Sequence, residues 1–252
     1  MHPVIFSIGN FEIYSYGLFV LLGLVIAYIF LLQEKKRYQI DSQTLSDLLF
    51  WILISGFITS RIFYILLNFS SFTKNPWDYI LSRSGFVFFA GLLGGILGAT
   101  IFITAKKLKF LNIADMLAPA IAIGHSLGRI GCFFYGCCYG KICTLPICVK
   151  FPFDSPAGES GQPVLPTQLI SAFFLVIIFS VLLYIRDKKK FDGEVFFNYL
   201  LLYGTFRFTI EFFRADTRGI FFYLTTSQWF SIISMGIGIV FIISNNFKLK
   251  QK

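Results

Sequence analysis

The feature that most constrains this chain of 252 residues is a series of seven apolar stretches, each long enough to cross a lipid bilayer. A helix that spans the hydrocarbon core needs about 20 residues, and the loops between the stretches leave little room for a soluble domain. We therefore expect an all-α, polytopic integral membrane protein with seven transmembrane helices. Their expected ranges are 13–32, 45–67, 85–105, 113–134, 167–185, 194–213 and 228–244.

The loops between these stretches alternate in positive charge. Thirteen Lys and Arg residues fall in the odd-numbered loops and the C-terminal tail, whereas six fall in the even-numbered loops and none before the first stretch. Cationic loops stay on the cytoplasmic side, so we expect the N-terminus outside and the C-terminus in the cytoplasm. This topology, together with attraction to anionic headgroups, explains most of the formal net charge of +9 and argues against nucleic acid as a partner.

The chain is expected to form a single seven-helix domain, residues 1–252, because no repeat or low-complexity linker divides it. Residues 1–12 contain no Lys or Arg. They lack the charged start of a removable signal peptide, so the first span should stay in the protein. One loop is long, residues 135–166, and contains five prolines, which predicts an irregular cap on the outer side.

Ionisable side chains within the spans fall mostly toward the outer side in this topology. Arg61 lies in the second span, Arg129 in the fourth, and Arg207 and Glu211 on one face of the sixth, whereas Asp115 near the inner end of the fourth is expected to cap that helix. Insertion of an ionisable side chain into a membrane span costs roughly 2.5 to 3.5 kcal/mol of free energy. Several such side chains at the same depth in the membrane therefore indicate a functional cavity. The planar guanidinium of arginine can donate two hydrogen bonds to a phosphate at once. The arginines therefore predict a site for an anionic phospholipid headgroup. The alternatives are a structural ion pair and arginines that extend to the membrane surface.

Six segments, in order along the chain, carry a resemblance to a known family. They are YSYGLFVLLG at 14–23, FVFFAGLLGGILG at 86–98, GRIGCFFYGCCYG at 128–140, PTQL at 166–169, RFTIEFFRAD at 207–216 and TTSQWFS at 225–231. This set resembles the prolipoprotein diacylglyceryl transferase family. The resemblance implies a seven-helix enzyme of the bacterial inner membrane with an outward-facing site. Such an enzyme moves the diacylglyceryl group of phosphatidylglycerol onto the lipobox cysteine thiol of prolipoproteins and releases glycerol phosphate.

By this resemblance, five residues stand at positions of the family's motifs: Tyr16, Arg129, Gly140, Arg207 and Glu211. Arg129 and Arg207 suit an electrostatic clamp for the phosphate of phosphatidylglycerol. We expect Tyr16 and Glu211 in the catalytic set with them, with Glu211 orienting the guanidinium of Arg207. Gly140 closes its motif and is expected at the lipid-binding site.

The chain also departs from the family's usual pattern. Cys132, Tyr135 and Cys137 stand where two asparagines and a glutamate are usual, and Phe89 stands where a histidine is usual. This pattern resembles a cysteine-containing branch of the family. We expect Cys132 and Cys137, together with Arg61, to line the phosphatidylglycerol site.

The acceptor thiol must become a thiolate, which requires a base or a positive field. His125 lies one helical turn before Arg129 on the same face of the fourth span. We nominate His125 as a substitute base, with a packed or interfacial role as the alternative.

Five cysteines fall within seventeen residues, namely Cys132, Cys137, Cys138, Cys143 and Cys148. In an oxidising exported space, one or two disulfides would staple the cap and leave an odd thiol. Their spacing lacks the CxxC pairs of a zinc site, so we expect neither a metal nor another cofactor. The expected partners are phosphatidylglycerol, lipobox peptides of prolipoproteins and membrane lipid. Two alternatives remain open: a non-catalytic paralogue that binds or moves phospholipid, and an outward-facing membrane thiol or metal protein.

Two overlapping GxxxG patterns, Gly91 with Gly95 and Gly94 with Gly98, lie in the third span. Their ordinary meaning is close packing against another helix. We favour this interpretation over a groove for lipid entry.

Overall fold

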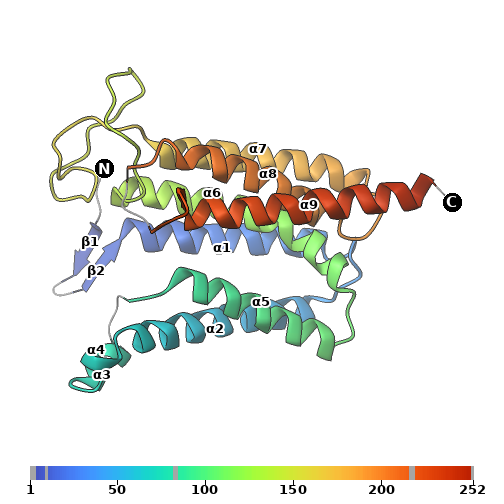
Figure 1. The fold of residues 1–252 in the computed structure, drawn as a ribbon. Coiled ribbons are helices and arrows are strands. Elements are labelled where there is room, and N and C mark those ends of the chain that lie inside the picture. Colours follow the sequence, from blue (N-terminus) through green and yellow to red (C-terminus); the bar gives the residue numbers. More distant parts are fainter. Residues whose placement is uncertain (1–3, 9–10, 82–84, 216–218, 251–252) are drawn as a thin grey trace. The chain divides into compact units, whose positions relative to one another are not determined.

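The chain is mostly helical in the computed structural model (Figure 1), which describes residues 4–8, 11–81, 85–215 and 219–250. Two short helices, α3 (Phe69–Phe72) and α4 (Pro76–Leu81), and two antiparallel hairpins, β1 (Val4–Ile8) with β2 (Phe11–Tyr14) and β3 (Ile220–Phe221) with β4 (Leu224–Thr225), accompany the long helices. The long helices are α1 (Ser15–Glu34), α2 (Ser42–Leu67), α5 (Phe88–Ala105), α6 (Phe110–Tyr135), α7 (Thr167–Asp187), α8 (Glu194–Glu211) and α9 (Thr226–Lys250).

Each of the seven predicted stretches overlaps one long helix, which confirms a mostly helical protein. Six of these helices, all except α8, are long and apolar enough to cross a membrane, as expected for a multi-pass membrane protein. Helix α8 differs because three of its 18 residues, Glu194, Arg207 and Glu211, are charged. A seventh span therefore stays a prediction, as does the orientation of the termini. The four short strands were not predicted, and β2 moves the start of the first helix from residue 13 to Ser15.

The chain divides into two compact units. The larger comprises Met1–Gln33 and Ala114–Lys252, with nearly all of α1 and α6, the cap and α7 to α9; the smaller comprises Glu34–Ile113. The prediction of a single domain is not tested by this division and stays a prediction.

In the smaller unit α2 and α5 pack closely, and glycines allow it. A β-carbon at Gly94 would lie 2.5 Å from Cβ of Thr59, and one at Gly98 would lie 2.8 Å from Cβ of Ser55. Any larger side chain would force the helices apart. The GxxxG patterns of α5 therefore serve close helix packing, as predicted.

In the larger unit α6 packs against α1 and also against α7 and α8. A β-carbon at Gly23 of α1 would lie 2.7 Å from the carbonyl oxygen of Gly124 in α6, so these two backbones are in direct contact. On another side α6 contributes to a buried apolar cluster with α7 and α8, composed of Ala118, Ala122, Ile178, Leu182, Val195 and Tyr199. The polar residues of α6 are thereby held next to both α1 and α8.

Asp115 fixes α6 to the start of α8. Its side chain is fully buried; Oδ1 accepts the amide of Phe196 at 2.9 Å, and Oδ2 accepts the amide of Gly193 at 2.8 Å and Nζ of Lys189 at 3.1 Å. A carboxylate at a helix N-terminus is stabilised by the free amides there. Asp115 therefore caps α8, and the prediction that it caps its own helix was wrong because that interpretation considered only local sequence.

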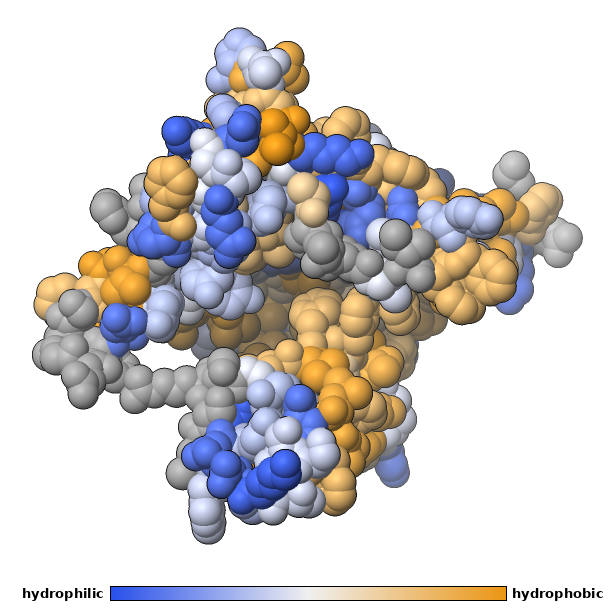
Figure 2. All heavy atoms as spheres, turned by 60° about the vertical axis from the view of Figure 1, so that its left-hand side comes forward, coloured by the Kyte–Doolittle hydropathy of each residue, from blue (hydrophilic) through white to orange (hydrophobic). Residues whose placement is uncertain are grey.

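The loop between α6 and α7 forms a cap with a small core of its own. Phe151, Ala157 and Val164 are buried in it, and Val149 and Val164 exchange two backbone hydrogen bonds of 3.0 Å. A disulfide joins Cys143 and Cys148, which confirms one predicted staple. Residues 136–166 of the cap form no helix, and they pair only through isolated β-bridges, as expected from the prolines of the cap. Figure 2, turned to bring this end forward, shows hydrophilic side chains on it beside exposed apolar ones.

Candidate functional site

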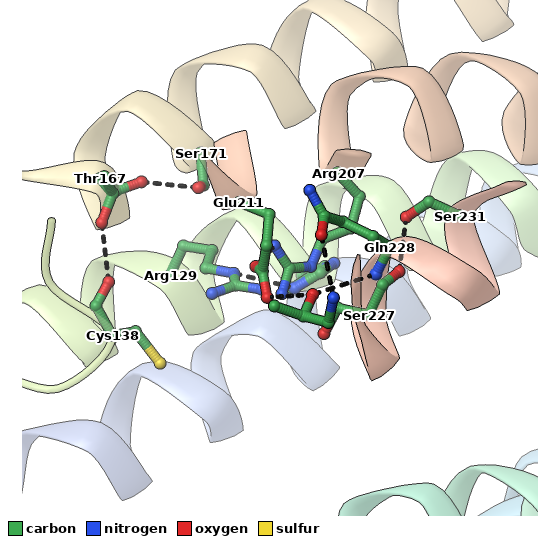
Figure 3. Close-up of polar contacts among 11 residues, drawn as sticks. Arg129, Cys138, Thr167, Ser171, Arg207, Glu211, Ser227, Gln228 and Ser231 are labelled. Atoms are coloured by element: carbon green, nitrogen blue, oxygen red, sulfur yellow. Dashed lines mark hydrogen bonds and ion pairs between the residues drawn. The ribbon is translucent and has the colours of Figure 1, made fainter. Parts of the chain in front are cut away.

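Four ionisable residues of α6 and α8 gather in the larger unit, near the start of α9 (Figure 3). His125 and Arg129 lie in the C-terminal half of α6, and Arg207 and Glu211 lie in the last turns of α8. In Figure 3 the side chain of Arg129 extends toward the Arg207–Glu211 pair. Arg129 and Arg207 both lie within electrostatic range of His125. Residues of α6 and α8 that are nearly ninety positions apart in the sequence therefore form one cluster of polar side chains.

Arg207 and Glu211 form a buried ion pair on one face of α8. Their side chains are 9% and 3% exposed, and Nη1 lies 2.5 Å from Oε2. The other carboxylate oxygen, Oε1, accepts the hydroxyl of Thr225 at 2.8 Å. Glu211 thus orients the guanidinium of Arg207, as predicted for it, while Thr225 holds Glu211.

Thr225 belongs to a reciprocal cap at the start of α9. Its amide donates to Oε1 of Gln228 at 2.9 Å, and the amide of Gln228 donates to Oγ1 of Thr225 at 3.3 Å. This is the capping-box arrangement, in which residues three apart satisfy each other's free amides. The sequence TTSQ therefore both starts α9 and positions the carboxylate of Glu211.

Arg129 is held by His125 one turn earlier in α6. Nε of Arg129 donates to Nε2 of His125 at 3.1 Å, and the imidazole packs against Tyr203 with ring centroids 5.5 Å apart. The acceptor nitrogen of the imidazole is therefore engaged with the guanidinium. This geometry favours His125 as a positioning residue for Arg129, whereas its predicted role as a base would need the lone pair of that same nitrogen.

A tight turn after α6 returns the chain over the ends of α7 and α8. Gly136 and Cys138 have positive φ angles of 81° and 62°, and glycine adopts such angles at no steric cost. A β-carbon at Gly140 would lie 2.8 Å from the carbonyl oxygens of both Leu165 and Phe213. Close packing therefore requires glycine at position 140, and its predicted contact with lipid stays a prediction.

Buried side chains of α7 support this turn. Nε2 of Gln168 donates to the carbonyl of Cys137 and Oγ1 of Thr167 donates to that of Cys138, both at 2.7 Å (Figure 3 shows the second). Gln168 is fully buried, and its Oε1 has no hydrogen-bond partner among the described residues. The backbone positions of Cys137 and Cys138 are thus fixed by hydrogen bonds from buried side chains of α7.

The turn brings three cysteines together. The sulfurs of Cys132, Cys137 and Cys138 all lie within 4.8 Å of one another, and all three residues are half-buried. The pKa of the Cys138 thiol lies below its ordinary value, because the thiols of Cys132 and Cys137 donate hydrogen bonds to its thiolate and because Arg214 and Arg129 add positive charge. The pKa of the Cys137 thiol is raised, because this thiol donates hydrogen bonds to Cys132 and to Cys138.

The remaining predicted site residues fall in different units. Tyr16, at the start of α1, is 46% exposed, packs against Tyr135 with ring centroids 6.5 Å apart, and lies within electrostatic range of Arg129 and the three cysteines. Arg61 lies in the smaller unit, where it donates to the carbonyls of Gly85 at 3.0 Å and Ile80 at 3.2 Å. Arg61 thus connects α2 to the segments before α5, and its predicted contact with the lipid stays a prediction.

Three residues near the site were not predicted as site residues: Cys138, Gln168 and Arg214. Arg214 is 7% exposed and pairs with Gly140 in an isolated antiparallel bridge. Gln168 lies in the PTQL segment and Cys138 in the CC pair, so both stood in the segments that carried the resemblance. The long-range pairing of residues 139–141 with 213–215 brings Arg214 to this turn, and the hydrogen bond to the carbonyl of Cys137 brings Gln168 there.

An apolar cavity of about 810 Å³ lies beside α7, α8 and the cap. Its walls include Phe174, Ile178, Leu202 and Phe206, and Lys141 is the one charged residue among those that line it. A space with such a lining suits hydrocarbon chains.

Comparisons with known proteins cover nearly the whole chain. The family model described as prolipoprotein diacylglyceryl transferase matches residues 3–244. A phosphatidylglycerol–prolipoprotein diacylglyceryl transferase of Clostridium tetani is 33% identical over 239 residues, which is 95% of this chain and 96% of its own length. This chain is also similar to two further proteins of the same name. The one from Rickettsia rickettsii is 34% identical and covers 98% of each chain. The one from Lysinibacillus sphaericus is 30% identical and covers 99% of this chain and 94% of its own length.

Proposed function

Because this chain belongs to the prolipoprotein diacylglyceryl transferase family, we propose that it transfers the diacylglyceryl group of phosphatidylglycerol to the thiol of a lipobox cysteine and releases glycerol phosphate. The observation that carries the proposal is the polar group of Arg129, Arg207 and Glu211, held in a unit rich in apolar helices. The alternative of a non-catalytic lipid-binding protein would need the same headgroup contacts but no thiol acceptor.

The reaction replaces a carbon–oxygen bond by a carbon–sulfur bond. The acceptor thiolate attacks the glyceryl carbon, and negative charge grows on the phosphate oxygen that leaves. Fixed positive groups stabilise charge that develops in a transition state, and a guanidinium can grip two phosphate oxygens at once. We assign Arg129 and Arg207 to this phosphate, His125 and Glu211 to the positioning of those two guanidinium groups, and Tyr16 to the edge of the same site.

We place the protein in the bacterial cytoplasmic membrane with seven spans and with its site on the outer side. The excess of Lys and Arg in alternate loops supports this orientation. Helix α8 is proposed as the remaining span, because charged groups in a span are accepted when they pair inside the bundle, as Arg207 does with Glu211. The cavity beside α7 and α8 would receive acyl chains of phosphatidylglycerol, with Lys141 near the headgroup.

The purified protein, incubated with labelled phosphatidylglycerol and a lipobox peptide, tests the proposal. We expect a labelled peptide and free glycerol phosphate, and no label on a control peptide with serine in place of the acceptor cysteine. Expression in a bacterium depleted of its own transferase should restore lipoprotein modification and growth. If the purified protein binds phosphatidylglycerol but forms no labelled peptide, and if its expression does not restore lipoprotein modification, the lipid-binding alternative would be favoured.

Two substitutions at His125 separate positioning from base catalysis. His125→Gln keeps an acceptor for Arg129, whereas His125→Leu removes it. For a positioning residue we expect the Gln variant to keep most of its turnover with an unchanged pH profile, and the Leu variant to lose about tenfold or more. Equal losses in both variants, with one limb missing from the pH profile, would restore the role of base.

A further inference from the structure

The group of Cys132, Cys137 and Cys138 is not used by the reaction as assigned above. The chain holds it in place independently of the thiols themselves: the amides of Gly136 and Cys137 both donate to the carbonyl of Cys132, at 2.9 and 3.1 Å. Buried Gln168 and Thr167 fix the next two carbonyls from the side of α7. Three soft ligand atoms are therefore set close together by backbone geometry, which is how proteins prepare metal sites.

The distances and the number of ligands suit a zinc ion. Zinc–sulfur bonds of about 2.3 Å in a tetrahedral arrangement place sulfurs about 3.8 Å apart, so sulfurs already within 4.8 Å need only small rotations. Thiolates select zinc over the hard cations. Within the described ranges, no His, Asp or Glu ligand atom joins these three sulfurs. Three protein ligands with one open position are the pattern of catalytic rather than structural zinc sites.

We propose that Cys132, Cys137 and Cys138 bind one zinc ion and that the fourth coordination position takes the thiol of the lipobox cysteine. The first part stands on the geometry alone, and the second rests on the proposed function. The charge of the site supports it as well, since Arg129 and buried Arg214 lie within electrostatic range of Cys138 and balance a zinc ion surrounded by thiolates.

The proposed zinc ion would activate the acceptor thiol, a role that none of the residues assigned above performs. A thiol that coordinates zinc gives up its proton at neutral pH; the proton passes to water or to the hydroxide that the thiol displaces. The sulfur then forms a bond to the glyceryl carbon, the bond from that carbon to the phosphate oxygen breaks, and its electron pair leaves with glycerol phosphate. The thioether product is neutral and binds zinc weakly, so the peptide is released. No oxidant or reductant takes part.

Metal content tests the first part. The full chain, purified in detergent with reductant after growth in zinc, should carry about one zinc per chain. The Cys138→Ser variant should lose most of it, whereas a matched variant with both Cys143→Ser and Cys148→Ser, outside the group, should keep it. Removal of zinc from the unaltered protein by a chelator, followed by cobalt, should give the absorption of thiolate-bound cobalt, and this measurement does not depend on how any variant folds. Absence of both zinc and the cobalt spectrum, or a disulfide within the group in the reduced preparation, would overturn the proposal.

The second part is tested on the same cobalt-loaded protein. A lipobox peptide with cysteine should shift the cobalt absorption, whereas the serine peptide should leave it unchanged. Chelated protein should lose transfer activity at least tenfold and regain it with zinc. A shift without lipidated product would leave the thiol site standing and refute the proposed transfer. Full transfer by metal-free protein would leave the proposed function standing and refute the zinc role.

Discussion

The ion pair of Arg207 and Glu211 provides a quantitative test of the site. Both side chains are under 10% exposed, and Nη1 and Oε2 are 2.5 Å apart, so the small energies of surface ion pairs do not apply. Glu211→Gln keeps an acceptor for the hydroxyl of Thr225 but leaves the guanidinium as a buried charge. Removal of one partner from a buried pair costs about 3–5 kcal/mol, and we expect a loss in this range, because the one amide oxygen that still accepts from Thr225 leaves an NH2 group facing the guanidinium.

The assay is reversible unfolding in detergent micelles, followed by helix content, with transfer activity measured on the same samples. Thr225→Val should cost less, about 1.5–3 kcal/mol, because it removes one hydrogen bond to a charged group and no charge. The double variant Arg207→Met with Glu211→Leu should recover much of the stability lost in Glu211→Gln, since an apolar pair of similar volume removes the unpaired charge, while it abolishes transfer. A cost below about 1 kcal/mol for Glu211→Gln, the range of exposed pairs, would refute the buried geometry.

Three further predictions address charge, thiols and topology. Arg129→Lys should reduce transfer by about 10²-fold with little change in stability, measured as turnover at saturating lipid, because lysine cannot reproduce a bidentate grip on phosphate. In metal-free protein Cys138 should react with iodoacetamide at pH 7 at least tenfold faster than Cys137, by peptide mass spectrometry, because its lowered pKa keeps the thiolate present to lower pH, whereas the raised pKa of Cys137 keeps that thiol protonated. Reporter fusions at Gly158 and Lys190 should read external and cytoplasmic, respectively; reversal of either would contradict the outward-facing site.

The helices were predictable because long apolar runs leave a chain few options in a membrane. Prediction failed where a residue's partner is distant in the sequence. Asp115 caps a helix that begins about eighty residues later, and no local pattern carries that information. Helix α8 was predicted as a helix, but its buried charges show why hydropathy alone does not assign it as a span.

The site was predicted unevenly for the same reason. The i,i+4 pairs Arg207–Glu211 and His125–Arg129 follow from helical periodicity and are in contact in the structure. The cysteine group does not follow from spacing rules, because those rules describe standard metal-binding loops. Here a turn with a positive φ at Cys138 places adjacent cysteines around one point with the end of α6.

Two departures from the family's usual motif belong to one structural feature, the group of three cysteines. Cys132 and Cys137 stand where the resemblance leads us to expect asparagine and glutamate, and their sulfurs share one site with that of Cys138. If these thiols act together, Cys132→Asn leaves two sulfurs, too few for a stable zinc site, and restores only part of the usual polar arrangement. We therefore expect this single replacement by the family's usual residue to lower both zinc content and transfer at least tenfold, measured on the protein from zinc-supplemented cells. Unchanged transfer in that variant would show that position 132 acts alone and that the three cysteines are not a functional unit.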